Sequence, residues 1–218
     1  MTDISWEGGR FSPAWLTRRT VDLLRVNFLR VAVAFVAMTA VGTAADVQAG
    51  SGLFFLANVV VLVMQYWLTA TLLDDLGLRL SGKARFPAFF VLGLVTGLGI
   101  LVGLVLLIVP GIILIVRWSI AVPAVISGEQ GTMDSVAYSW RQTDGKFWSI
   151  LATFLVLYAP GLAVAVGSYA FPSPPSFILP ATIISELAMN AAFIAGWHGA
   201  IAIYVETRRR TGVSEVFA

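Results

Sequence analysis

The stretch "AFFVLGLVTGLGILVGLVLLIVPGIILIVRWSIAVPAVIS", Ala88 to Ser127, decides the fold of this 218-residue chain. It runs for about 40 residues without a polar loop, and as one straight helix it would be roughly 60 Å long, twice the hydrocarbon thickness of a bilayer. The chain must therefore fold back on itself here. Pro110 cannot donate to a helical hydrogen-bond ladder and Gly111 tolerates a left-handed backbone, so this pair is the predicted apex of a hairpin between two spans.

The composition indicates an integral membrane protein. Hydrophobic residues make up 58% of the chain and charged residues only 12%, whereas soluble domains carry about 25% charged residues. The absence of cysteine excludes a disulfide framework and a thiolate metal site. The basic residues lie beside the apolar windows instead of forming one face, so we expect anionic membrane lipid as the partner and no nucleic acid. A protein partner or a second copy of the chain is left open.

Six windows are long and apolar enough to span a bilayer. They are Val26–Ala45, Leu53–Leu73, Ala88–Val109, Ile112–Ser127, Phe147–Ser168 and Ala181–Val205. Lysine and arginine are retained on the cytoplasmic side, and the connections "ADVQAGSG" and "YAFPSPPSFILP" contain neither. We therefore predict an all-α, multi-pass protein of the cytoplasmic (inner) membrane, with an uncleaved first span and both termini cytoplasmic.

Two cytoplasmic segments have the pattern of amphipathic helices that lie on the membrane surface. The first, residues 12–25, has Ser12 as a cap and Pro13 at its first position. The second, residues 132–144, has Arg141 in its last turn and apolar residues at i, i+3, i+4 and i+7. These apolar residues are Met133, Val136, Ala137 and Trp140. Each segment leads into a pair of spans, so the chain contains a weak internal repeat of one surface helix and two spans. Duplication explains this repeat, and so does the general tendency of membrane chains to enter the bilayer through a surface helix.

The predicted organisation is a single membrane domain over residues 1–218. Its parts are the surface helix 12–25, spans one and two in 26–73, the hairpin in 88–127, the surface helix 132–144, spans five and six in 147–205 and a cytoplasmic tail in 206–218.

The stretch "LLIVPGIILIVRWSIAVPAVISGEQGTMDSVAYSWRQTDGKFWSIL", Leu106 to Leu151, resembles the membrane domain associated with bacterial glycerophosphodiester phosphodiesterases, and related uncharacterised membrane families. The residues that carry the resemblance are Pro110, Gly111, Arg117, Glu129, Gly131, Ala137, Ser139, Trp140, Arg141 and Gly145. The resemblance implies a Pro-Gly hairpin, an arginine in the returning helix and a surface helix that ends at glycine. It does not imply the hydrolase activity, which in those proteins belongs to a separate soluble barrel.

The sequence offers little catalytic chemistry, and we expect no cofactor, no metal and no catalytic residue. It has no Walker loop, H-E-x-x-H or G-x-S-x-G motif. Glycines in the third window form two small-xxx-small pairs that let another helix approach closely; they are Gly93, Gly97, Gly99 and Gly103. Asp74 and Asp75 are typical of solvated charges at a span end, and His198 and Gln65 are expected to form hydrogen bonds between helices.

Polar residues inside the spans form the candidate site. Depth counting from the predicted apex places Arg117, Glu186 and Asn58 in one layer, with Asn190 one turn from Glu186. An ionisable residue costs about 2.5–3.5 kcal/mol at the centre of a span, so each needs a partner or a route to the surface. Three interpretations stay open: Arg117 extends to the headgroups, it pairs with Glu186, or the four residues line a polar cavity.

These observations favour a non-enzymatic membrane protein that acts as a lipid-contacting scaffold or regulatory module. The alternative is a small transporter or channel that uses the layer around Arg117 and Glu186. A third hypothesis is a lipid-processing enzyme with Asp74 and Asp75 at the inner face.

Overall fold

The computed structural model describes residues 11–48, 52–80, 85–171, 174 and 177–216. Within these residues the chain is helical and contains no strand, so the all-α prediction is confirmed. Six helical segments are long and apolar enough to cross a membrane, by length and composition. They are α2 (Phe28–Val47), α3 (Leu53–Asp75), α4 (Phe86–Leu106), α5 with α6 (Ile108–Arg117 and Ala121–Ser127), α8 (Phe147–Ala170) and α9 (Ile178–Val216).

The hairpin between α4 and α5 turns at Leu107, three residues before the predicted apex. Leu107 is extended, with φ −157° and ψ 128°, and both Pro110 and Gly111 lie in the first turn of α5. A proline ring clashes with the carbonyl group four residues earlier, here that of Leu106, so the helix has to end before the proline and not at it. The prediction that Pro110 and Gly111 form the apex is therefore wrong by one helical turn.

Glycines allow the two arms of the hairpin to approach closely. A Cβ atom on Gly103 would lie 3.0 Å from the Cα atom of Gly111, so a side chain at Gly103 would push α4 and α5 apart. Gly99 packs against the ring of Trp118 in the same way, whereas Gly93 and Gly97 have no such neighbour among the described residues. One of the two small-xxx-small pairs, Gly99 with Gly103, thus packs inside the protein as predicted.

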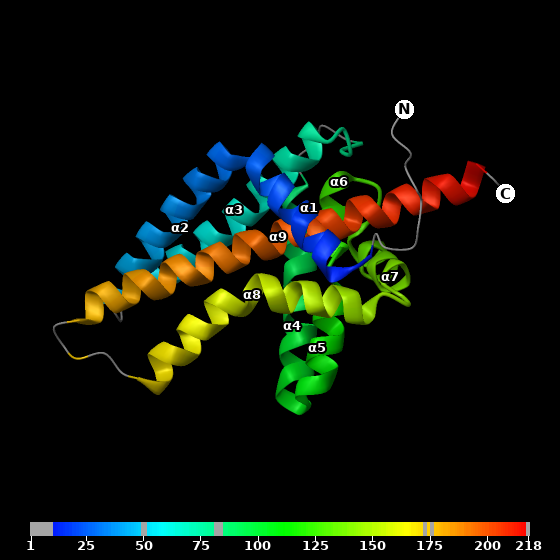
Figure 1. The fold of residues 1–218 in the computed structure, drawn as a ribbon. Helices are drawn as coiled ribbons and strands as arrows, with labels where there is room; N and C mark the ends of the chain where they lie inside the picture. Colours follow the sequence, from blue (N-terminus) through cyan, green and yellow to red (C-terminus); the bar gives the residue numbers. More distant parts are fainter. Residues whose placement is uncertain (1–10, 49–51, 81–84, 172–173, 175–176, 217–218) are drawn as a thin grey trace.

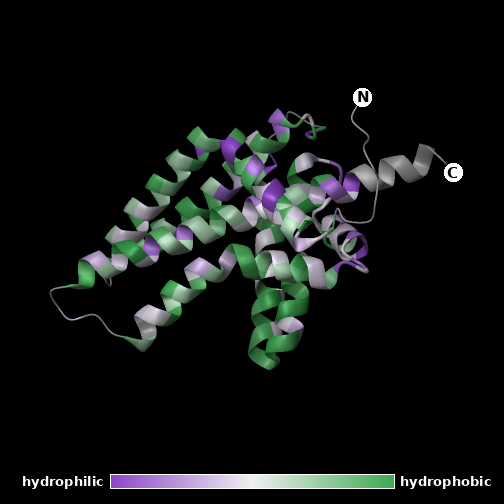
Figure 2. Cartoon of the chain, in the orientation of Figure 1, coloured by the Kyte–Doolittle hydropathy of each residue, from purple (hydrophilic) through white to green (hydrophobic). Residues whose placement is uncertain are grey.

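The spans divide into a bundle and a projecting hairpin. In the view of Figure 1, α2, α3, α8 and α9 extend together to the left, and the α4–α5 hairpin points away from them. Beyond its own two arms, the hairpin packs mainly through α6. Figure 2 shows hydrophilic residues concentrated near α1, α6 and α7, whereas the hairpin is hydrophobic along almost its whole length.

Two shorter helices, α1 (Pro13–Val26) and α7 (Thr132–Gln142), occupy the positions of the two predicted surface helices. The Ser12 hydroxyl accepts a hydrogen bond from the Trp15 amide at 3.2 Å, and Pro13 is the first helical residue, as the sequence predicts. α1 buries Leu16, Thr20 and Leu23 against α8 and α9. The residues predicted as a tail, as far as Val216, continue α9 as helix; residues 217 and 218 lie outside the described residues.

Candidate functional site

The span that contains Arg117 is broken between α5 and α6, and α7 satisfies the backbone groups at the break. The carbonyl group of Arg117 accepts a hydrogen bond from the Ser139 hydroxyl at 2.7 Å. The same hydroxyl accepts one from the Ile120 amide at 3.2 Å. Ile120 is completely buried, and a buried backbone group without a partner is costly, so one serine on α7 stabilises both sides of the break.

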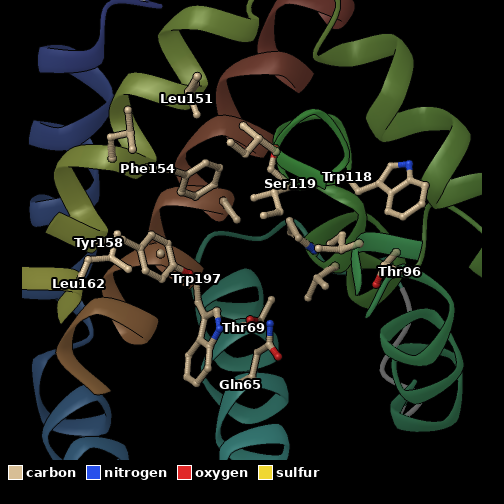
Figure 3. A pocket seen from close by; sticks show the side chains of 18 residues that line it. Gln65, Thr69, Thr96, Trp118, Ser119, Leu151, Phe154, Tyr158, Leu162 and Trp197 are labelled. Atoms are coloured by element: carbon tan, nitrogen blue, oxygen red, sulfur yellow. The ribbon is translucent and has the colours of Figure 1, made fainter. Parts of the chain in front are cut away.

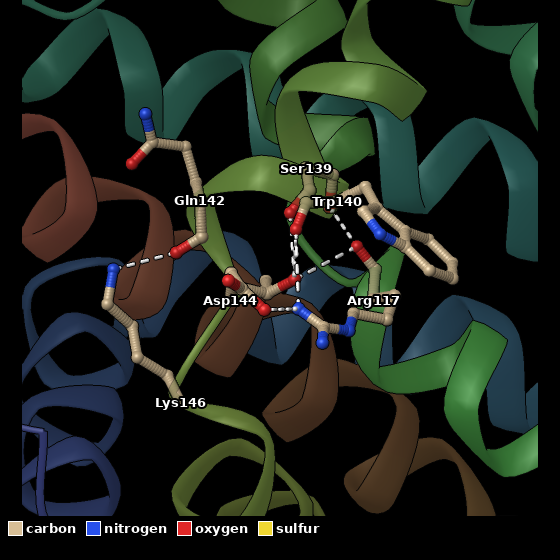
Figure 4. Close-up of polar contacts among 7 residues, drawn as sticks. Arg117, Ser139, Trp140, Gln142, Asp144 and Lys146 are labelled. Carbon is tan, nitrogen blue, oxygen red and sulfur yellow. Dashed lines mark hydrogen bonds and ion pairs between the residues drawn. The ribbon is translucent and has the colours of Figure 1, made fainter.

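The side chain of Arg117 also turns toward α7 (Figure 4). Its Nη1 lies 3.0 Å from Oδ1 of Asp144, and the guanidinium lies 5.3 Å from the ring centre of Trp140. Arg117 is only 18% exposed, whereas Asp144 is 76% exposed. We call this set of residues the α5–α7 junction: Arg117, Ile120, Ser139, Trp140 and Asp144.

α7 presents two different faces, one toward the protein and one away from it. Ser135 and Ser139 are completely buried on one face, and Thr143, next on the same side, is buried too. The predicted apolar face is largely exposed, since Met133 is 55% and Trp140 43% exposed. α7 therefore packs on the protein through small polar side chains together with Val136 and Tyr138, and it leaves Met133 and Trp140 exposed.

The connection that leads into the first turn of α7 contains a second polar cluster, around Glu129. The Tyr204 hydroxyl donates to Oε2 of Glu129 at 2.6 Å and lies 3.0 Å from the Ser127 hydroxyl. Arg208 forms an ion pair with the other oxygen of Glu129. Burial raises the pKa of Tyr138 on α7, and the negative charge of Glu129 raises it further. The connection before α7 is thus held to the C-terminal half of α9.

Residues 76–195, more than half of the chain, match the family described as the membrane domain of glycerophosphoryl diester phosphodiesterase. The chain belongs to this family. No curated protein and no solved structure matches it. The resemblance based on Leu106–Leu151 is confirmed and extends well beyond that stretch.

Membership gives the matched residues a structural meaning. The family match contains the whole α5–α7 junction, and Arg117, Ser139 and Trp140 are all part of it. Gly145 has φ +68°, a left-handed conformation that suits glycine and lets the chain turn from α7 into α8. The sequence missed Asp144, because an ion pair across 27 residues between a span and a connecting loop has no periodic signal.

The predicted polar layer is not formed. Asn190 donates to Oε2 of Glu186 at 2.9 Å and to the Thr39 hydroxyl at 3.3 Å. Asn58 donates to the Phe54 carbonyl of its own helix, and Arg117 lies at the α5–α7 junction. The depth count failed because it began at the wrong apex and assumed that the hairpin runs beside α9. Arg117 neither pairs with Glu186 nor extends to the headgroups beyond the hairpin turn.

Asp74 and Asp75 are exposed at the end of α3, as the sequence predicts, and each also forms an ion pair with an arginine. Asp74 pairs with Arg79 at 2.6 Å, and Asp75 pairs with Arg30. His198 donates from Nδ1 to the Ile194 carbonyl of its own helix at 2.8 Å, so the predicted bond between helices is wrong for this residue. The described residues contain no group of three or more side chains that could hold a metal.

Proposed function

We propose that the chain is a non-enzymatic, lipid-contacting membrane module, a scaffold or regulatory module, in which α7 lies on the bilayer surface and packs against the spanning helices. The exposed apolar face of α7 carries this proposal, because a helix that buries serines and exposes Met133 and Trp140 is the reverse of a helix on a soluble protein. Trp148, 78% exposed at the start of α8, continues this apolar surface, and tryptophan is enriched at the membrane interface.

The charge distribution supports a cytoplasmic position for this surface. By the positive-inside rule, the connections rich in lysine and arginine, and α7 with its Arg141, belong on the inner side of the cytoplasmic membrane. With six spans, this proposal has both termini on the same, cytoplasmic side. Arg141 and Arg18 are exposed and suit anionic headgroups, each basic residue near the surface contributing about 1 kcal/mol.

The other two hypotheses have less geometric support. A transport pathway through the layer around Arg117 and Glu186 requires residues that lie in separate places. The enzyme hypothesis requires Asp74 and Asp75 to be available, and each is paired with an arginine. We accordingly propose that the purified chain does not hydrolyse glycerophosphodiesters.

Single spin labels on α7 test the surface position, and the cysteine-free chain makes them simple to introduce. Met133→Cys and Asp134→Cys label neighbouring exposed positions that point about 100° apart around the helix. In vesicles that contain phosphatidylglycerol, we expect the label at 133 to collide mainly with oxygen, which partitions into lipid, and the label at 134 mainly with an aqueous nickel chelate. Equal aqueous accessibility at both positions would contradict the proposal.

A further inference from the structure

A cavity of about 590 Å³ lies between the α4–α5 hairpin and the α8–α9 pair (Figure 3). Its volume is within the range of about 300–1,000 Å³ that is typical of ligand pockets. We call it the α4–α8 cleft. Its lining residues are Gln65, Thr69, Thr96, Ile100, Ile112, Ile115, Trp118, Ser119, Val122, Pro123, Leu151, Phe154, Leu155, Tyr158, Leu162, Gly196, Trp197 and Ala200.

The cleft contains polar groups that lack partners. The Ser119 hydroxyl is buried without a hydrogen bond in the described part of the chain. The Gln65 amide likewise makes no hydrogen bond to any described residue, and it lies beside Thr69, one turn along α3 (Figure 3). An unpaired amide or hydroxyl in an apolar environment costs roughly 1–3 kcal/mol. These groups therefore favour a ligand that offers hydrogen bonds.

No lining residue of the cleft carries a charge. Gln65 is the thirteenth of the 23 residues of α3, so it lies roughly 18 Å from the first residue and roughly 15 Å from the last residue of that helix, near the middle of a helix long enough to span a bilayer. A phosphate group at this depth would be desolvated with no cation to pair with, at a cost of many kcal/mol. The polar part of the ligand must therefore be uncharged.

We propose that the α4–α8 cleft binds one uncharged lipid with hydroxyl and ester groups, of the diacylglycerol type. Its oxygen atoms meet the Gln65 amide and the Ser119 hydroxyl, and its chains lie along the apolar wall formed by Ile112, Phe154 and Leu162. Such a lipid is available at this depth because the cleft lies between membrane-spanning helices. The site is separate from the exposed face of α7, so this inference stands or falls independently of the proposed function.

Binding of dioleoylglycerol and dioleoylphosphatidylglycerol to the detergent-solubilised chain, measured by native mass spectrometry, tests the proposal. The two lipids have the same acyl chains and differ in the charged headgroup. Ala200→Phe fills the cleft, and Ala40→Phe adds the same bulk at an exposed position on α2. We expect dioleoylglycerol to bind at least tenfold more tightly than the phospholipid. We also expect Ala200→Phe to weaken dioleoylglycerol binding about tenfold and Ala40→Phe to leave it unchanged.

The double variant Gln65→Leu with Ser119→Ala tests the polar contacts. It should weaken dioleoylglycerol binding at least fivefold without lowering the melting temperature of the ligand-free protein, because both polar groups lack partners in the structure. Equal binding of the two lipids would overturn the inference, as would dioleoylglycerol binding that survives Ala200→Phe. Because α7 accessibility is measured separately with the spin labels, failure here would leave the proposed function intact.

Discussion

Replacing Ser139 by alanine tests whether the α5–α7 junction holds the broken span together. The hydroxyl bonds the Ile120 amide at 3.2 Å and the Arg117 carbonyl at 2.7 Å. The carbonyl retains a longer contact of 3.4 Å to the Thr143 hydroxyl, so the main loss is a buried amide without a partner. Such a loss costs roughly 1–3 kcal/mol, and we expect a decrease of about 2 kcal/mol in the free energy of unfolding.

Ser135→Ala provides a matched control on the same helix. Ser135 is as completely buried as Ser139, but its hydroxyl donates only to the Thr132 carbonyl in its own first turn. Both substitutions gain the same helix propensity, so the difference between them isolates the bonds to Arg117 and Ile120. A difference of 2 kcal/mol corresponds to a melting temperature lower by about 4–8 °C for a chain of this size. Thermal unfolding followed by tryptophan fluorescence measures it, and equal melting temperatures would refute the reasoning.

Two further predictions concern α4 and α7. Gly103→Ala should destabilise the protein by about 1–3 kcal/mol, because the new Cβ atom meets Gly111. Its control, Gly97→Ala, should be neutral or stabilise the protein by up to about 1 kcal/mol through helix propensity. Thermal unfolding measures both variants, and an equal loss of stability in the two would contradict the prediction. Burial keeps Tyr138 neutral in the folded protein to a higher pH than in the unfolded chain, which ionises near pH 10. Its stabilising effect is thus complete below about pH 10 and is lost above it, and Tyr138→Phe should reduce the fall in melting temperature above about pH 10.

The positions of the spans along the chain could be predicted because they depend on local quantities. Apolar length determines where a chain can cross a bilayer, and the 40-residue stretch from Ala88 could be accommodated only by a turn. The caps of α1 and the position of Gly145 follow from residue chemistry within one helical turn. The hairpin apex was misplaced by one turn because the clash of Pro110 acts on the carbonyl group four residues earlier, at Leu106.

The candidate site could not be predicted in the same way because it depends on angles between helices. Counting residues gives depth only for helices that run parallel, and the hairpin diverges from the bundle (Figure 1). Glu186 and Asn190 are neighbours in the structure because they share one helix, which is a local property. Arg117 and Asp144 come together across a loop, and neither periodicity nor depth contains that information.

The α5–α7 junction links the two surfaces that we assign to lipid. The connection between α5 and α6 contains Trp118 and Ser119, which both line the α4–α8 cleft. The residues on either side of this pair, Arg117 and Ile120, are those that the Ser139 hydroxyl bonds. One side chain, that of Ser139, therefore connects α7 to the wall of the cleft. Ile120 and Ser139 are completely buried, so water does not reach the break, and the hydroxyl of Ser139 supplies the hydrogen bonds that its backbone groups need.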